Sequence, residues 1–137
     1  MARRYRRKSK GVPKNGSFVV QMNAIVSEVE DDVKEAMYEA MDKVTIEAVQ
    51  RLKASSPRAP GGGRYAEGWT YEQRADSNVV YNATDYQLTH LLEYGHAVKP
   101  KPTHPGKKAR VDARPHIKTV EQWANTEFEN EISRLLS

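Results

Sequence analysis

The sequence predicts an α+β domain in which a long N-terminal helix and a C-terminal helix pack on a small, mostly antiparallel sheet. Two long segments, residues 26–52 and 117–135, repeat apolar side chains every three or four positions, which is the helical period. Between them, residues 68–73 and 78–83 are rich in β-prone side chains and flank turn residues, which predicts a hairpin. A short helix follows the hairpin. The length of 137 residues fits one domain with a modest core.

The chain divides into a basic arm, residues 1–16, and a single α+β domain, residues 17–137. The arm lacks the apolar side chains that would offset the entropy cost of ordering, so we expect it to be disordered when nothing holds it. The apolar run Phe18-Val19-Val20 follows, and it fits either a strand or a lead-in to the first helix.

The first helix is expected from about Ser27 to about Ser55. Ser27-Glu28-Val29-Glu30 fits a capping box, in which the Ser27 hydroxyl would accept from the first free backbone amides. Pro57 ends the helix, because the residue before a proline avoids the helical region. At 1.5 Å per residue the helix would be about 40 Å long. This length predicts that the helix extends beyond its own core and packs against another chain.

The short helix is expected to open at Thr84-Asp85-Tyr86-Gln87, a second capping-box pattern. It would carry Leu88, Leu91 and Leu92 on one face, and Gly95 suits the left-handed position at its C-terminal end. In the hypothesis given below, these leucines and Tyr94 position the helix against the sheet.

The segment after the short helix, residues 97–110, is expected to be a basic loop, because it combines Pro and Gly with several lysines. Residues 109–113 fit a third strand. The C-terminal helix is expected to begin between Pro115 and Thr119.

Charge is distributed in blocks, although the formal net charge is only +4. Residues 1–14 hold seven basic side chains and no acid, and residues 99–118 hold seven against Asp112. Acidic side chains outnumber basic ones in residues 15–98 and 119–137. Blocks of opposite sign predict that the basic segments meet something charged, either nucleic acid or the acidic face of a neighbouring subunit.

The residues give no catalytic or cofactor-binding constellation. There is no Cys, which removes thiolate chemistry and disulfides, and no Gly-x-Ser-x-Gly nucleophile motif. His90 and His96 are six residues apart and would point to different faces of a helix, whereas a zinc helix needs a spacing of four. We therefore expect a protein that is not an enzyme and that uses no metal or other cofactor.

No apolar run approaches the roughly 18 residues that a membrane span requires. The first residues are basic, and no apolar segment of a secretory signal follows them. We expect a protein without membrane contact that is made in a cytoplasm.

Two segments together resemble a known family. Tyr86-Gln87-Leu88-Thr89-His90-Leu91-Leu92-Glu93-Tyr94-Gly95-His96-Ala97, followed by Arg114-Pro115-His116-Ile117, is similar to the neck or tail-completion proteins of long-tailed bacteriophages, which are also described as head-tail joining or minor tail proteins. The order of predicted elements is similar across about residues 27–136. The basic arm is not part of this resemblance.

The resemblance implies a structural virion protein of the phage neck, assembled in the host cytoplasm. It would form a ring that joins the head-completion complex to the tail terminator and lets DNA pass, with six subunits inferred and twelve as the alternative. In a head-to-tail ring each subunit uses two different patches.

On this interpretation a polar cluster fixes the basic loop against the short helix, and Gly95 permits a tight exit from that helix. The cluster would serve the fold or the subunit interface, and it consists of His90, Glu93, Tyr94, His96, Arg114 and His116. Basic residues of the arm and loop would reach neighbouring subunits or genomic DNA: Arg3, Arg4, Arg6, Arg7, Lys8, Lys10, Lys99, Lys101, Lys107, Lys108 and Arg110.

The alternative function is a small basic DNA-binding module that uses the N-terminal arm. Phosphate neutralisation by the arm would support it, although no base-reading motif is present. This alternative predicts salt-sensitive duplex binding by a monomer that forms no ring.

Overall fold

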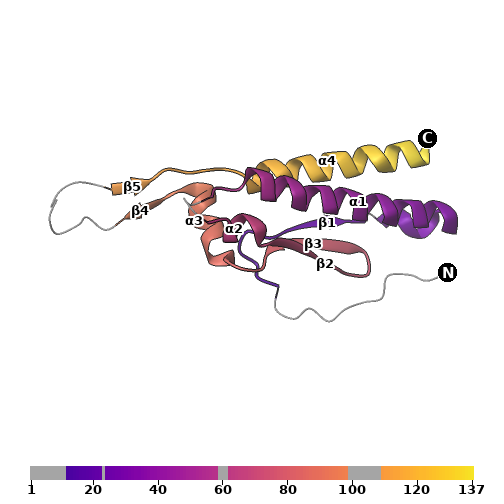
Figure 1. Cartoon of the computed structure of the whole chain (residues 1–137). Coiled ribbons are helices and arrows are strands. Elements are labelled where there is room, and N and C mark those ends of the chain that lie inside the picture. The colour runs from indigo at the N-terminus through magenta and orange to yellow at the C-terminus, as the bar shows by residue number, and fades with distance from the viewer. Residues whose placement is uncertain (1–11, 23, 59–61, 99–108) are drawn as a thin grey trace.

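The computed structural model describes residues 12–22, 24–58, 62–98 and 109–137. It confirms the α+β fold: two long helices lie side by side over a small antiparallel sheet (Figure 1). A thin two-stranded ribbon leaves this body at one end (Figure 1).

The sheet has three strands in the order β1-β3-β2, and both pairs are antiparallel. The expected hairpin is its β2–β3 pair, and the apolar run at Phe18 is a strand rather than a lead-in, since Phe18 pairs with Val80. Phe18 and Val20 face the core while Val19 is exposed, which is the alternation of a half-buried strand. The strands are β1 (Phe18–Gln21), β2 (Trp69–Gln73) and β3 (Ser77–Asn82).

The long helices are α1 (Asp31–Ser55) and α4 (Ile117–Leu136). The start of α4 is as predicted, but α1 begins four residues later than expected because a 3₁₀ turn, η1 (Ala24–Glu28), comes first. The capping box at Ser27 is therefore wrong. Glu30, in extended conformation, precedes the helix and makes no side-chain cap hydrogen bond, so Ser27 lies one turn too early to cap α1.

The core fills the space between the helix pair and one face of the sheet. Met37, Met41 and Leu52 of α1 are completely buried there, and α4 adds Phe128 and Ile132. A buried polar contact joins the two layers, because Asn78 Nδ2 of β3 donates to Asp42 Oδ1 and Thr45 Oγ1 of α1, both at 2.9 Å.

Three short helices connect these layers: α2 (Arg64–Glu67), η2 (Tyr86–Leu88) and α3 (Thr89–Tyr94). The second capping box is also wrong. Asp85 precedes η2 without a side-chain cap, and the Thr84 hydroxyl donates instead to the Arg64 carbonyl at 3.0 Å.

The inward face of α3 differs from the prediction. Leu88 and Leu91 are each 37% exposed, and the buried residues of α3 are Thr89 and Glu93. Of the three leucines expected to pack inward, only Leu92 lies partly buried against the core.

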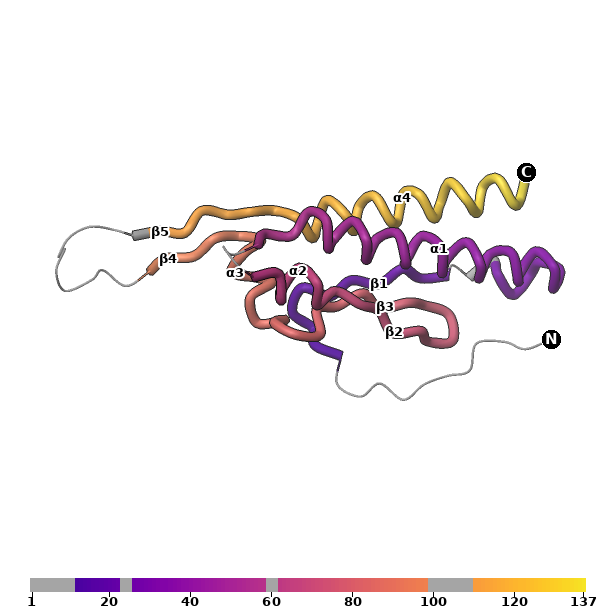
Figure 2. The backbone as a smooth tube through the Cα atoms, in the orientation of Figure 1, coloured from indigo at the N-terminus to yellow at the C-terminus, as the bar shows by residue number. Residues whose placement is uncertain are grey.

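The segment predicted as the basic loop 97–110 is strand at both of its ends. The strands β4 (His96–Val98) and β5 (Ala109–Val111) pair antiparallel as a separate two-stranded ribbon. The ribbon and the extended residues at its base run outward beyond the ends of α1 and α4 (Figure 2). Within the described part of the chain, no helix combines the length and the apolar character that crossing a membrane requires.

Candidate functional site

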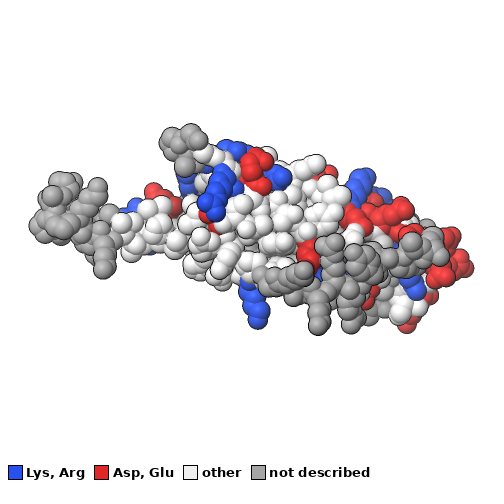
Figure 3. All heavy atoms as spheres, turned by 60° about the horizontal axis from the view of Figure 1, so that its bottom comes forward, with Lys and Arg blue, Asp and Glu red and all other residues white. Residues whose placement is uncertain are grey.

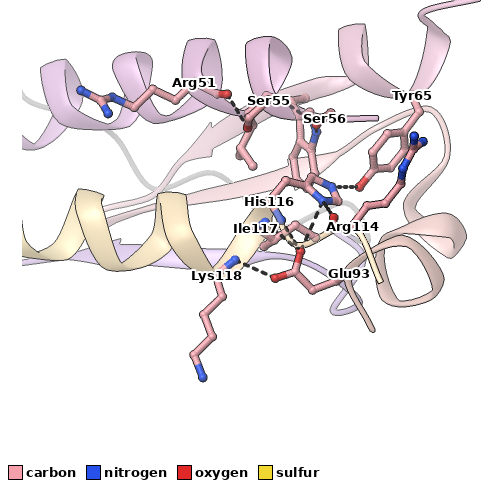
Figure 4. Close-up of polar contacts among 11 residues, drawn as sticks. Arg51, Ser55, Ser56, Tyr65, Glu93, Arg114, His116, Ile117 and Lys118 are labelled. Atoms are coloured by element: carbon pink, nitrogen blue, oxygen red, sulfur yellow. Dashed lines mark hydrogen bonds and ion pairs between the residues drawn. The ribbon is translucent and has the colours of Figure 1, made fainter. Parts of the chain in front are cut away.

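Glu93 caps the N-terminus of α4 although it lies on another helix. Its Oε1 accepts from the backbone N–H groups of His116 and Ile117, both at 2.8 Å. Its Oε2 accepts from the backbone N–H of Lys118 at 3.1 Å (Figure 4). The residue that precedes α4, His116, makes no side-chain cap of its own. The carboxylate thus satisfies three amides that a helix start leaves free, and its charge suits the positive end of the helix dipole.

The imidazole of His116 links this cap to two other elements. Its Nδ1 donates to the carbonyl oxygen of Arg114 at 2.8 Å and lies 3.3 Å from Glu93 Oε1. A carbonyl can only accept, so Nδ1 carries a proton, and Nε2 makes a hydrogen bond with the Tyr65 hydroxyl at 2.7 Å. His116 is only 2% exposed, and every polar atom of its ring has a partner.

Two more residues extend the cluster to the end of α1. The indole N–H of Trp69 donates to Ser56 Oγ at 2.8 Å, and Ser56 Oγ donates to the Leu52 carbonyl at 2.5 Å. The rings of Tyr65 and Trp69 meet edge to face at 5.8 Å, and Tyr65 meets His116 in the same way at 5.6 Å. We call this set the junction cluster: Ser56, Tyr65, Trp69, Glu93 and His116.

The electrostatics of the junction cluster follow from its burial. Burial alone would raise the pKa of Glu93, but three backbone hydrogen bonds and the His116 ring favour the charged form, and the pKa falls below its usual value. Burial, with the Glu93 charge nearby, raises the pKa of Tyr65 well above 10.0. The cluster therefore favours the charged form of the Glu93 carboxylate and the neutral form of the Tyr65 phenol.

Only part of the predicted polar cluster comes together. Glu93 and His116 are in contact, and Arg114 contributes backbone groups: its carbonyl accepts from His116, and its N–H donates to the Leu92 carbonyl at 2.7 Å. The side chain of Arg114 is exposed. Within one chain, the structure thus brings together Glu93, His116 and the main chain of Arg114.

His90, Tyr94 and His96 lie outside the junction cluster. The ring of His90 is exposed and lies 4.9 Å from that of Tyr94, which is itself 58% exposed. His96 stands at the start of β4, and its Nδ1 has no hydrogen-bond partner among the described residues. These three residues line the route from α3 to the ribbon and do not build the cap.

Gly95 ends α3 with the positive φ that was expected, 75°. A Cβ at this position would lie 2.6 Å from the Val111 carbonyl oxygen and 2.8 Å from the Ala113 nitrogen. The glycine is needed both for its backbone conformation and for the close approach of the two chain segments at the ribbon base.

Sequence reasoning missed Ser56, Tyr65 and Trp69 as partners of the motif residues. One signal was available: α4 follows Pro115-His116 with no Ser, Thr, Asp or Asn at its start, so its free amides needed an acceptor from elsewhere. The choice of Glu93 and the aromatic partners depends on contacts between distant segments, which no local pattern contains.

The last described residues of the basic arm pack against α3. Gly16 has a φ of 70°, and a Cβ there would collide with the side chain of Thr89. Ser17 Oγ donates to the Lys14 carbonyl at 3.0 Å and closes this turn. The arm thus enters the domain beside the helix that carries Glu93.

Exposed apolar side chains continue from α3 to the ribbon. Leu88, Leu91 and Tyr94 recur at three-residue spacing on the exposed side of η2 and α3. Val98 and Val111 of the ribbon are 41% and 39% exposed.

Most of the predicted arm and loop contacts lie outside the described residues: Arg3, Arg4, Arg6, Arg7, Lys8, Lys10, Lys99, Lys101, Lys107 and Lys108. Arg110 is described. It is exposed, and its guanidinium donates to the Tyr94 carbonyl at 3.4 Å, which connects the ribbon to the end of α3.

Among the described residues, no group of three or more His, Asp or Glu side chains is arranged to hold a metal ion. Comparisons of the chain with known protein families, curated proteins and solved structures find no match.

Proposed function

We propose that the chain is a structural virion protein of a bacteriophage neck, a ring subunit that joins the head-completion complex to the tail and has no enzymatic role. The observation that carries an assembly role is the β4–β5 ribbon. Among the described strands, β4 and β5 pair only with each other, and they project from the body (Figure 2). Val98 and Val111 are exposed on them. An isolated two-stranded ribbon is marginally stable in water, so a partner surface is expected to cover it.

The resemblance to neck proteins supplies the choice of assembly, and the site supports it. The two segments that carry the resemblance, residues 86–97 and 114–117, are separate in the sequence and meet through Glu93 and His116. Together they fix the base of the ribbon, because Arg114 N–H donates to the Leu92 carbonyl and Gly95 lies against Val111. The residues that carry the family resemblance are therefore those that set the direction of the β4–β5 ribbon.

The proposal is tested by deleting the gene from the phage or prophage that encodes the chain. A neck subunit predicts a lysate of DNA-filled heads and separate tails in electron micrographs, and added purified protein should restore joined, infectious particles. A Glu93→Gln protein that folds serves as a graded variant in the same assay. Joined and infectious particles in the absence of the chain would refute the proposal.

The same purified protein separates this function from the DNA-binding alternative. A DNA-binding module predicts that the monomer binds duplex DNA with a steep salt dependence carried by the arm. A neck subunit predicts restored head-tail joining whether or not the free chain binds DNA.

A further inference from the structure

We propose that two copies of the chain pair antiparallel through the free edge of β5, about a twofold axis at Val111, and so join their ribbons into one four-stranded sheet. Such a contact is isologous and closes on itself, because both copies use the same surface. The inference goes beyond the proposed function: it concerns the free chain, and a neck ring requires further contacts of another kind.

Strand β5 has an edge that no described strand covers. On one side it pairs with β4, where Val111 lies opposite His96, and among the described strands it has no second neighbour. Residues 110–114 are all exposed, and residues 112–116 lead from β5 back to α4 without helix or strand (Figure 2). A free edge is ready to accept another strand, and a ribbon of two strands gains stability from a third.

The sequence along this edge is complementary to itself. Residues 109–113 read Ala-Arg-Val-Asp-Ala. When this segment pairs antiparallel with its own copy about Val111, Arg110 of each copy lies opposite Asp112 of the other, and alanine lies opposite alanine at both ends. Opposite charges that face each other across two antiparallel strands stabilise the pair. The edge therefore carries the features of its own partner.

Both charged side chains are available for this pairing. Asp112 is exposed and has no ion-pair partner within the described parts of the chain. Arg110 is exposed too, and its contact with the Tyr94 carbonyl is long, at 3.4 Å. Figure 3 shows acidic and basic groups on the ribbon, well away from the acidic groups that gather at the far end of the body. A second copy supplies the counter-charge that each of the two side chains lacks in its own chain.

Charge also selects the register of the pairing. A pairing centred on Arg110 would place this cation opposite its own copy, and a pairing centred on Asp112 would place two carboxylates opposite each other. Like charges directly opposite destabilise a strand pair. The pairing centred on Val111 avoids both conflicts and forms two ion pairs.

The faces of the two ribbons also match in this arrangement. The register of β4 and β5 places His96, Val98 and Val111 on one face and Ala97 and Arg110 on the other. A twofold axis perpendicular to the sheet keeps each face with its own kind. The two copies of Val111, each 39% exposed in the single chain, then lie side by side on the apolar face, and the ion pairs lie on the opposite face.

Charge variants test the two ion pairs. In Arg110→Asp both charged positions of the edge are acidic, and in Asp112→Arg both are basic, so each variant sets like charges against each other in its own dimer. The double variant with both substitutions restores opposite charges and keeps the net charge of wild type. Lys43→Glu, at an exposed position of α1, is the control for a reversed charge elsewhere. Circular dichroism establishes that each variant is folded before sedimentation equilibrium measures its mass.

We expect wild type, the double variant and the Lys43→Glu control to form dimers at low salt and concentrations up to about 1 mM. Each single variant at the edge should dimerise about tenfold more weakly or worse. An equimolar mixture of Arg110→Asp and Asp112→Arg should recover the dimer, because every acidic position then lies opposite a basic one.

A thiol at the axis tests the register. The chain contains no Cys, so Val111→Cys introduces a single thiol. Its two copies would lie directly opposite, with Cβ atoms about 5 Å apart, and mild oxidation should cross-link them. Val98→Cys is the matched control, because Val98 is 41% exposed on the same face but lies on β4. Its two copies would be separated by both β5 strands, at about 14 Å for a strand spacing of about 4.8 Å, and should not cross-link.

Four results would overturn the inference: a wild-type chain that stays monomeric up to about 1 mM, single edge variants that dimerise like wild type, a folded mixture that stays monomeric, or equal cross-linking through the two thiols. Association that none of the edge variants changes would belong to another surface and would overturn it as well. Any of these results leaves the neck proposal standing. Joined particles without the chain refute the neck proposal and leave the pairing of β5 standing.

Discussion

Glu93 Oε1 lies 2.8 Å from the backbone nitrogen of His116 and 3.3 Å from Nδ1 of its ring, so one carboxylate oxygen fixes both the main chain and the side chain of that residue. The start of α4 is thereby tied to α3. The extended residues that lead into the ribbon lie between the two, so this contact sets the ribbon's direction as well as the helix start.

Removing the remote cap should destabilise the fold. Glu93→Ala leaves the amides of His116, Ile117 and Lys118 without their acceptor in a buried place, and we expect a loss of about 1–3 kcal/mol in the free energy of unfolding. Urea denaturation measures the loss. Glu129→Gln, an exposed carboxylate on α4, is the control and should change the free energy by less than about 0.5 kcal/mol. Equal effects of the two substitutions would refute the cap.

The cap should make stability depend on acid pH. The pKa of Glu93 is lower in the folded chain than its ordinary value of 4.5, so its contribution is complete above that value and is lost as the pH falls through the folded pKa. Glu93→Gln cannot ionise. The difference in unfolding free energy between wild type and Glu93→Gln should therefore be constant near neutral pH and shrink below pH 4.5. A difference that does not change with pH would show that the charge of Glu93 has no role.

Tyr65 should produce the opposite dependence at alkaline pH. Its folded pKa is raised above 10.0, so its contribution is present below that pH and is lost as the pH rises toward the folded value. Tyr65→Phe removes the hydrogen bond to His116 and should cost about 1 kcal/mol at neutral pH. Its stability should then fall less steeply than that of wild type above pH 10.0. Tyr86→Phe, at an exposed tyrosine, should follow the wild-type profile.

Gly95→Ala tests the ribbon base. The added Cβ would meet the Val111 carbonyl oxygen at 2.6 Å, and a φ of 75° is strained for any residue with a Cβ, so we expect a cost of more than about 1 kcal/mol. Hydrogen exchange should show that the amides of β4 and β5 lose protection first. Gly62→Ala is the matched control, because a Cβ there would meet no heavy atom of the described residues within 4 Å apart from its chain neighbours. A Gly95→Ala protein as stable as Gly62→Ala would refute this account of the turn.

The features that sequence reasoning predicted are those with a local cause. Helix α4 and the β2–β3 hairpin follow from periodicity and turn residues, and Gly95 follows from its position at a helix end. The start of α1 was misplaced because the apolar side chains of a 3₁₀ turn and of a first helical turn have similar spacing. Ser27 matched the capping-box pattern, but α1 does not begin there.

The errors at α3 and the ribbon have a tertiary cause. The leucines of α3 were expected inside because they are apolar, but the buried face carries Glu93, which caps α4, and Thr89, which meets Gly16. Strand β4 was missed because its three residues are defined by pairing with β5 across the loop. The partnership of Glu93, His116 and Tyr65 joins three separate segments, and no periodicity in one of them specifies the other two.

The sheet order β1-β3-β2 has a consequence for how the chain folds. The β2–β3 hairpin closes a short loop, whereas β1 must find Val80 and its neighbours after all of α1 and the hairpin have been synthesised. Loop-closure entropy places that pairing late. Until β1 pairs with β3, the edge of β3 that β1 covers has free backbone groups, and Val79 and Val80 are uncovered. During this interval a newly made chain is most exposed to pairing with the wrong strand.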